Sequence, residues 1–200
     1  MKKRYSVLVM ISCIVLVTII TINLVANTTD NKISAGEIQE NVELYYPTAY
    51  EVSDLIENST YVVSGRFGKF VTSWNMARNP DNIKEEDPDY YIEGKVYEFI
   101  VDDCLKGILD DKKEILINLP YAHGDVIDEE YIEPDENESN ILFLDYDENS
   151  GYYYPALEPY NFVLSDNDLF VKTNKHEVMK SFNAGKELNL NNLKIKLKDN

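Results

Sequence analysis

Hydrophobic and polar residues alternate most clearly in the stretch Tyr97–Gly107, YEFIVDDCLKG, near the middle of the chain. Tyr97, Phe99 and Val101 occupy every second position, and a period of two places such residues on one face of a β-strand. Aromatic and β-branched side chains suit a half-buried, pleated surface. Gly107 permits positive φ and can reverse the chain. The pattern therefore predicts a central strand whose aromatic face lies in the core.

Similar patterns predict further strands on both sides of this one. Tyr61–Thr72 contains Gly65 and Gly68, which indicate a bulge or a sharp bend. Ile141–Leu144 is a continuous apolar run, as in a strand that is buried on both faces. The other predicted strands are Glu114–Pro120, Tyr152–Pro155 and a hairpin of Asn161–Leu164 with Leu169–Lys172.

Two long polar stretches, residues 73–90 and 121–139, separate these strands and are expected to be loops. Trp74 lies in the first of them. We expect it to pack under the loop rather than to stand exposed at a binding edge, because tryptophan is highly buried on average.

Short helices are predicted on both sides of the strand region. The first covers residues 48–58, where Thr48 and Glu51 have the spacing of a capping box. Its apolar residues form one stripe, as in a helix with a single buried face. The second helix is predicted for Lys175–Phe182, with Asn174 as its N-cap.

The N-terminal segment, residues 1–26, consists of a basic head and about twenty mostly apolar residues, long enough to cross a bilayer as a helix. Lys2, Lys3 and Arg4 place the rest of the chain outside the cytoplasm by the positive-inside rule. We expect a signal anchor in a single-pass protein of the cell membrane. Two alternatives stay open: a cleaved signal peptide, which would release a secreted protein, and a lipoprotein modified at Cys13.

Three further regions follow the N-terminal segment. Residues 27–47 are polar without periodicity and are interpreted as a linker. Residues 48–174 contain all the predicted strands and form the predicted β domain. Residues 175–200 are a C-terminal appendage, helical or extended, because the leucine spacing after Asn189 fits both structures. We favour the helix there.

The net charge of the chain limits the classes of partner that it can bind. The formal net charge is -17 at pH 7, with 36 acidic residues against 19 Lys and Arg. Such a chain repels phosphate backbones, so nucleic acid is not expected as a partner. Basic proteins, basic peptides or divalent cations are better candidates.

The acidic residues are concentrated between Lys113 and Lys172, a stretch that contains no Lys or Arg. The candidate acidic interaction face consists of Asp125, Asp128, Glu129, Glu130, Glu133, Asp135, Glu136 and Glu138. One interpretation is a face that meets a basic partner or cations. The other is a solvated, self-repelling loop that aids solubility.

Asp145, Asp147 and Asn149 alternate as D-x-D-x-N, the pattern that begins a calcium-binding loop. Ser150 and Ala156, however, stand where an EF-hand requires Gly and Glu. A hairpin turn accounts for the same residues, since Asp, Asn and Gly suit turn conformations. We therefore expect no cofactor and keep the three residues as candidate Ca²⁺ ligands.

The order of these elements resembles a known group of domains. A short helix runs into VVSG at Val62–Gly65, and YEFIV with LKG, ILINLP, ILFL and YYYP follow. This order looks like that of secreted or membrane-anchored domains of Gram-positive bacteria. More distantly, it is similar to the netrin-like module of the tissue inhibitors of metalloproteinases. The resemblance covers Asp54–Val171 and implies a mainly β fold, a five-stranded OB-like β-barrel with flanking short helices, here preceded by one N-terminal transmembrane helix.

These observations favour a membrane-tethered extracytoplasmic module that binds a protein, a peptide or an envelope component and is not an enzyme. The sequence contains no nucleophile elbow, phosphate-binding loop, dinucleotide fingerprint or HExxH motif. Two alternatives stay open. The resemblance implies an inhibitor or immunity-like partner of a secreted enzyme, and the many carboxylates allow an envelope hydrolase that uses a carboxylate pair.

Overall fold

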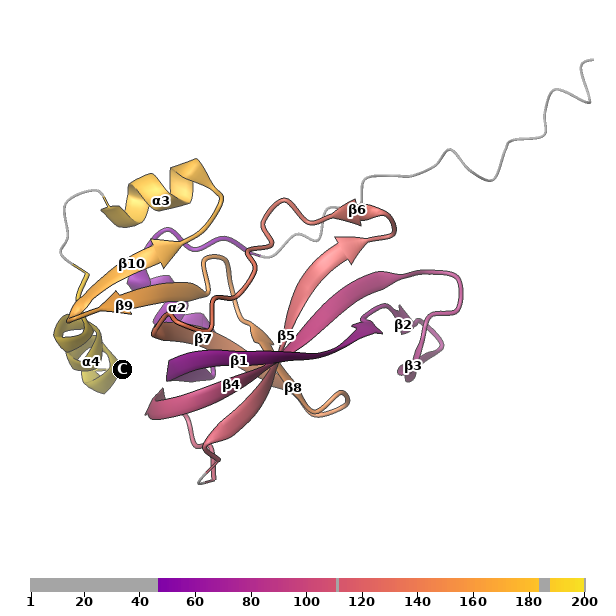
Figure 1. Cartoon of the computed structure of the whole chain (residues 1–200), viewed down its shortest axis with the longest axis horizontal. Helices are drawn as coiled ribbons and strands as arrows, with labels where there is room; N and C mark the ends of the chain where they lie inside the picture. Colours follow the sequence, from indigo (N-terminus) through magenta and orange to yellow (C-terminus); the bar gives the residue numbers. More distant parts are fainter. Residues whose placement is uncertain (1–46, 111, 184–187, 200) are drawn as a thin grey trace, which may run out of the picture. The chain divides into compact units, whose positions relative to one another are not determined.

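The strands expected from the alternating pattern are present in a computed structural model that describes residues 47–110, 112–183 and 188–199. The described chain is mainly β with a few short helices (Figure 1). Its strands are β1 (Tyr61–Asn75), β2 (Arg78–Asn79), β3 (Asn82–Glu86), β4 (Ile92–Lys106), β5 (Glu114–His123), β6 (Val126–Ile127), β7 (Asn140–Asp147), β8 (Tyr152–Pro155), β9 (Asn161–Ser165) and β10 (Asp168–Lys172). Its helices are α2 (Val52–Asn58), α3 (His176–Asn183) and α4 (Leu190–Asp199).

Five of the strands pair in a closed order. β1 pairs with β4, β4 with β5, and β7 with β8, all antiparallel, while β5 and β8 run parallel where Ile117 meets Tyr153. β1 also pairs antiparallel with β7, which returns the order β1-β4-β5-β8-β7 to its first strand. β9 and β10 continue from β7 as a hairpin, β6 pairs with the end of β5, and β2 and β3 form a separate two-stranded sheet.

Two of the irregularities in the β1–β4 pairing lie at the glycines of β1, where the sequence predicted a bulge or a bend. The β1–β4 register shifts between Ser64 and Gly65 and again between Phe67 and Phe70, a stretch that includes Gly68. A Cβ atom on Gly65 would lie 2.1 Å from the backbone oxygen of Ile100. No other residue fits this close approach of two strands.

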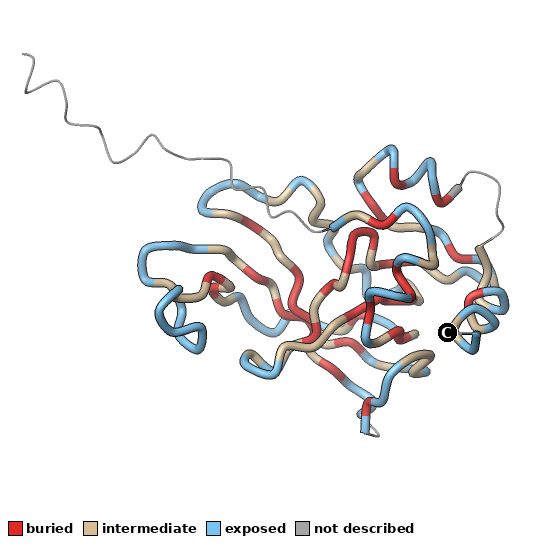
Figure 2. The backbone as a smooth tube through the Cα atoms, turned by 180° about the vertical axis from the view of Figure 1, so that it is seen from behind, coloured by how far each residue is buried: buried red, intermediate tan, exposed pale blue. Residues whose placement is uncertain are grey.

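The buried side chains form two clusters, one on each side of the strands. The inner core receives residues from all five strands of the closed order: Val63, Phe67, Tyr97, Phe99, Ile115, Ile117, Leu119, Leu142, Leu144 and Tyr153, with Leu109. The outer core lies between the strands and the helices: Ala49, Leu55, Ile56, Val62, Ile141, Phe143, Leu157, Phe162, Leu169, Val178, Phe182 and Leu193. Figure 2 shows the buried positions along the strands and the exposed ones at the turns.

Two expectations about buried faces are confirmed by these clusters. Tyr97 and Phe99 lie in the inner core, and Val101 packs against it. The apolar run Ile141–Leu144 is buried on both faces, because alternate residues enter the outer and the inner core.

The first helix begins later than predicted. α2 starts at Val52, and its N-cap is Glu51, whose backbone N–H donates to the Asp54 carboxylate at 3.3 Å. Thr48, the predicted cap, instead lies in a β-bridge with Glu158. The backbone of Ala49 donates to the oxygen of Glu158 at 2.7 Å, and this pairing keeps the chain extended before the helix.

The two long polar stretches contain strands that the sequence pattern did not reveal. β1 continues to Asn75, and β2 and β3 form a hairpin within residues 73–90. β5 continues to His123, and β6 folds back onto it within residues 121–139. In β3 every residue is exposed, so no apolar face marks the strand in the sequence.

The C-terminal part is helical, as we favoured. α4 begins after Asn189, whose side-chain oxygen accepts a hydrogen bond from the Asn192 backbone at 2.9 Å. α3 begins at His176, so Lys175 rather than Asn174 directly precedes it. The Asn174 amide donates to the backbone oxygen of Glu129 at 2.9 Å, and the Thr173 hydroxyl accepts from the Lys175 N–H at 3.1 Å.

The described residues belong to one compact unit that follows residue 42. The predicted membrane segment, residues 1–26, lies outside the described residues. Within 47–110, 112–183 and 188–199, no helix is both long and apolar enough to span a bilayer.

Candidate functional site

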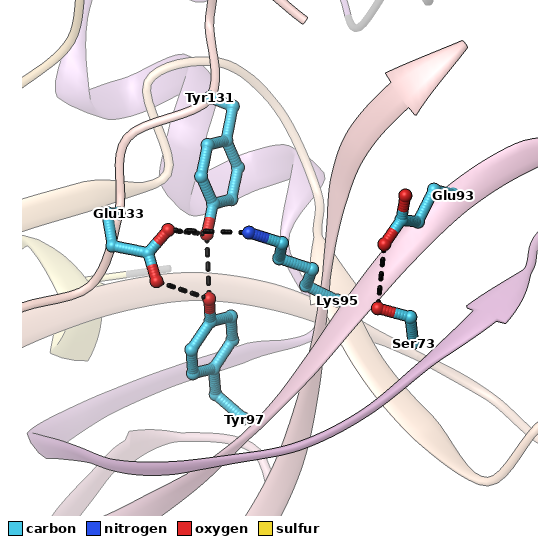
Figure 3. A network of polar contacts seen from close by, with 6 residues as sticks. All are labelled: Ser73, Glu93, Lys95, Tyr97, Tyr131 and Glu133. Carbon is cyan, nitrogen blue, oxygen red and sulfur yellow. Dashed lines mark hydrogen bonds and ion pairs between the residues drawn. The ribbon is translucent and has the colours of Figure 1, made fainter. Parts of the chain in front are cut away.

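The acidic loop, which we define as residues 125–138, is attached to the strands by a network of hydroxyl and carboxylate groups (Figure 3). Tyr131 from this loop and Tyr97 from β4 bring their hydroxyl oxygens within 2.7 Å of each other. Both hydroxyls donate to the Glu133 carboxylate, Tyr97 at 2.8 Å and Tyr131 at 2.6 Å. Because the Tyr97 ring is part of the inner core, the network ties the loop to that core.

Lys95 supplies the positive charge of this network. Its ammonium lies 3.6 Å from the Glu133 carboxylate and 3.5 Å from the centre of the Tyr121 ring. The Tyr131 ring centre is 5.0 Å from the same ammonium. An ammonium over an aromatic face is attracted by the ring quadrupole, so Lys95 holds two aromatic rings and one carboxylate together.

The ionisation of the network follows from its contacts. Burial raises the pKa of Tyr97 to about 12 and moves the pKa of Tyr131 upward as well, helped by the neighbouring Glu133. The hydrogen bond from Tyr131 lowers the pKa of Glu133. Near neutral pH the tyrosines are therefore neutral donors and Glu133 is an ionised acceptor. This arrangement suits a fixed attachment rather than proton transfer.

A small pocket lies beside the network. Its walls are Pro120, Asp128, Glu130, Tyr131, Pro155, Glu158 and Tyr160, and its volume is about 20 Å³. Such a volume holds about one water molecule, far below the volume of pockets that enclose a substrate-sized ligand. Glu158, which is 5% exposed, is the most buried acid in its wall.

Burial raises the pKa of Glu158 to about 7. The hydrogen bond from Thr173 opposes this rise, the negative charges of Glu130 and Asp128 add to it, and Lys175 counteracts it. Nothing in the sequence marked Glu158, since it stands in a short connection between two strands and far along the chain from its neighbours in the pocket.

The structure brings the eight predicted acidic residues onto one loop, but it neutralises part of their charge. Three ion pairs join the loop to lysines of other segments: Glu130 to Lys175, Glu133 to Lys95 and Glu138 to Lys172. Two aspartates close turns, with Asp128 accepting from the backbone of Glu130 at 2.8 Å and Asp135 from that of Asn137 at 2.9 Å. Asp125, Glu129 and Glu136 are exposed and form no ion pair within the described residues.

The candidate calcium ligands occupy a turn and a strand pairing. Asp147 accepts hydrogen bonds from the backbone of Asn149 at 3.0 Å and of Ser150 at 3.2 Å. Its burial favours a higher pKa, but these hydrogen bonds outweigh it and lower the pKa. Asp145 instead accepts from the Thr60 hydroxyl at 2.6 Å and from its N–H at 2.9 Å. Asp145 and Asp147 thus direct carboxylate oxygens to protein donors, and the described residues contain no group of three or more His, Cys, Asp or Glu that could hold a metal ion.

Trp74 is half-buried and packed, as expected. Its indole N–H donates to the Asn118 side-chain oxygen at 2.9 Å, and its ring meets the Tyr152 ring edge-on at 5.3 Å. The Arg78 guanidinium lies 4.3 Å from the ring centre.

No protein-family model matches this chain, and a search of curated proteins found no significant relative.

Proposed function

We propose that this chain is a membrane-tethered, non-enzymatic binding module that lies outside the cytoplasm and recognises a basic partner through the acidic loop. The observation that carries the proposal is that some acids of the loop form ion pairs with lysines whereas others remain exposed and unpaired. Lysines from other segments fix the loop through three of them, while Asp125, Glu129 and Glu136 stay exposed without an ion pair in the described chain. A fixed backbone that presents unpaired charge loses little conformational freedom on binding.

The finer fold belongs to the same proposal: an OB-like, netrin-like β-barrel. Its support is the strand order β1-β4-β5-β8-β7, in which the first strand pairs with both the second and the last. The inner core, to which all five strands contribute, is also what a small closed barrel requires.

The partner is a protein, a peptide or an envelope component with a cationic surface. The chain carries nearly twice as many acidic as basic residues, so its field attracts cations and repels nucleic acid. Attraction of this kind raises association rates and weakens when salt screens it.

The test uses the full chain in detergent and a short fluorescent peptide of alternating lysine and serine. The loop variant replaces Asp125, Glu129 and Glu136 by their amides. We expect it to weaken peptide binding by about tenfold at low salt and much less at high salt.

A control variant makes the same change of net charge at exposed acids away from the loop, Glu57, Asp102 and Asp166. It should weaken binding far less than the loop variant. Equal losses of peptide affinity in the two variants would show that the loop is not the contact surface. A loss of affinity that does not depend on the salt concentration would contradict an electrostatic module.

The proposed topology has its own test. Protease added to intact cells should digest the β domain and leave a small membrane-bound fragment. A fully protected chain in cells whose wall admits the protease would contradict an extracytoplasmic domain.

A further inference from the structure

The end of the sheet formed by β4, β5 and β6 carries an apolar surface that neither core uses. We define the tip patch as Tyr90, Tyr91, Val126 and Ile127. Their exposed fractions are 37%, 48%, 58% and 54%. None of the four belongs to or packs against the inner or the outer core.

Backbone pairing brings the four residues to the same end of the sheet, two on each of its faces. The N–H of Gly124 donates to the oxygen of Tyr91 at 3.2 Å, which joins the start of β4 to the β5–β6 turn. His123 pairs with Val126 across that turn, and the Tyr90 ring lies 4.9 Å from the His123 ring. Directly paired residues of antiparallel strands share a face and successive residues alternate, so Tyr90 and Val126 lie on one side of the turn, whereas Ile127, which pairs with Ala122, lies on the other.

The turn itself is shaped to present these side chains. Gly124 has a φ of 56°, which favours glycine, and a Cβ atom there would have no heavy-atom neighbour within 4 Å. The two strand residues of β6 therefore pair with β5 on one edge and stand at the end of the sheet (Figure 1). Exposed apolar patches that are rimmed by polar residues mark interaction sites.

Acidic residues surround the tip patch. Asp89 precedes Tyr90, Asp125 precedes Val126, and Asp128 and Glu129 follow Ile127. The nearest ammonium along β4, that of Lys95, is already paired with Glu133. A negative rim repels an anionic lipid surface and a second copy of this acidic chain, and it attracts a basic protein segment.

We infer that the tip patch is the anchoring surface for a protein segment whose aliphatic side chains are flanked by lysine or arginine. The inference rests on the proposed function, because the acidic loop supplies part of the rim, and it adds the place and the chemistry of the contact. The segment passes over the end of the sheet, so that its apolar side chains cover both halves of the tip patch and its basic side chains meet the rim. An apolar centre within a charged rim is the arrangement that concentrates binding energy in protein interfaces.

The experiment compares two fluorescent peptides on the full chain in detergent. One is the lysine–serine peptide used above, and the other differs only in having leucine at its two central serines. We expect the leucine peptide to bind about tenfold tighter, since it buries apolar area on the patch. Replacing Val126 and Ile127 by serine should remove this advantage and leave the binding of the serine peptide unchanged.

A matched control replaces Phe170 and Ile195 by serine, since these residues are 54% and 58% exposed and also lie outside both cores. The control should keep the preference for leucine. Equal binding of the two peptides to the wild-type chain would overturn the inference while the salt-dependent binding of the serine peptide still supported the proposed function. If neither peptide binds, the proposed function fails and the inference fails with it.

Two other occupants of the tip patch, a lipid surface and a second copy of this chain, can be tested with the same variant. Vesicles of zwitterionic or anionic lipid that bind the wild-type chain, but not the Val126 and Ile127 variant, would overturn the inference in favour of a membrane contact. Concentration-dependent self-association that the same variant loses, measured by sedimentation, would overturn it in favour of a second copy of this chain.

Discussion

Replacing Glu158 by glutamine is expected to change how the stability of the β domain depends on pH. The Glu158 side chain is 5% exposed. Burial raises its pKa from the ordinary glutamate value of 4.5 to about 7 in the folded state. Between these two values the folded state binds more protons than the unfolded state. The free energy of unfolding therefore falls as the pH rises through this range.

The size of the effect follows from the two pKa values. Their difference corresponds to roughly 3 kcal/mol, and about 2.5 kcal/mol of it is lost between about pH 5 and about pH 8. The remainder is lost at lower pH, where glutamate in the unfolded chain already begins to ionise. Glutamine keeps the shape of the side chain but binds no proton, so Glu158→Gln should lack this decline and exceed the wild-type stability above pH 7.

Urea unfolding of residues 43–200 across this pH range measures the difference directly. Subtracting the variant curve from the wild-type curve cancels the titration of the other groups to the extent that they are independent. As a control, Glu130→Gln should lower the pKa of Glu158 and shift the wild-type decline to lower pH, because the Glu130 charge raises that pKa. Parallel curves for the wild type and Glu158→Gln would refute the raised pKa and the desolvation behind it.

Three further predictions test the core, the network and the turn. Phe99→Ala should cost roughly 3–5 kcal/mol because Phe99 is fully buried in the inner core, whereas Glu98→Ala should cost at most about 1 kcal/mol; equal costs in urea would contradict the assigned faces. Tyr131→Phe should lower the unfolding free energy by about 1–3 kcal/mol through its lost hydrogen bond to Glu133, and Tyr121→Phe should cost less in the same assay. Calcium and magnesium should raise the melting temperature alike and only at millimolar levels; a calcium-selective rise that Asp147→Ala abolishes would establish a calcium site.

The strands that build the core could be read from the sequence because they have a buried face. Tyr97 and Phe99 repeat at the strand period, and Ile141–Leu144 is apolar at every position. Burial on one face or on two faces leaves such patterns directly in the sequence. The glycines of β1 also predicted their bend, because a close approach of two strands excludes a Cβ atom.

Elements without a buried face left no such signal. β3 is exposed at every position, and β6 consists of two exposed residues, so both lay hidden in stretches predicted to be loops. The start of α2 was misplaced for another reason. Thr48 has a suitable residue three positions ahead, but its backbone pairs with Glu158, a contact that depends on the tertiary fold.

The sequence predicted which acidic residues form the candidate site, but not which of them are neutralised or buried. A stretch without Lys or Arg predicts an unbalanced negative charge, yet Lys95, Lys172 and Lys175 reach the acidic loop from outside that stretch. Both the ion pairs of the loop and the burial of Glu158 depend on contacts between segments that are far apart in the sequence, so a local sequence pattern does not reveal them. The sequence therefore overstated the net negative charge of the acidic loop. It also concealed Glu158, a buried carboxyl group with a raised pKa in the wall of the neighbouring pocket.

If the proposed function holds, the position of the neutralised acids decides where the basic partner docks. The ion pairs engage Glu130, Glu133 and Glu138, which lie in the part of the acidic loop that leads into β7. A partner that competed for these carboxylates would have to displace a lysine each time, which offsets the gain from its own charge. Asp125 and Glu129 flank β6, where no such displacement is needed. For the proposed basic partner, the same charge therefore contributes more to binding at Asp125, Glu129 and Glu136 than at the three ion-paired positions, and a scan of single amide substitutions along the loop should show its largest losses of affinity at these unpaired acids.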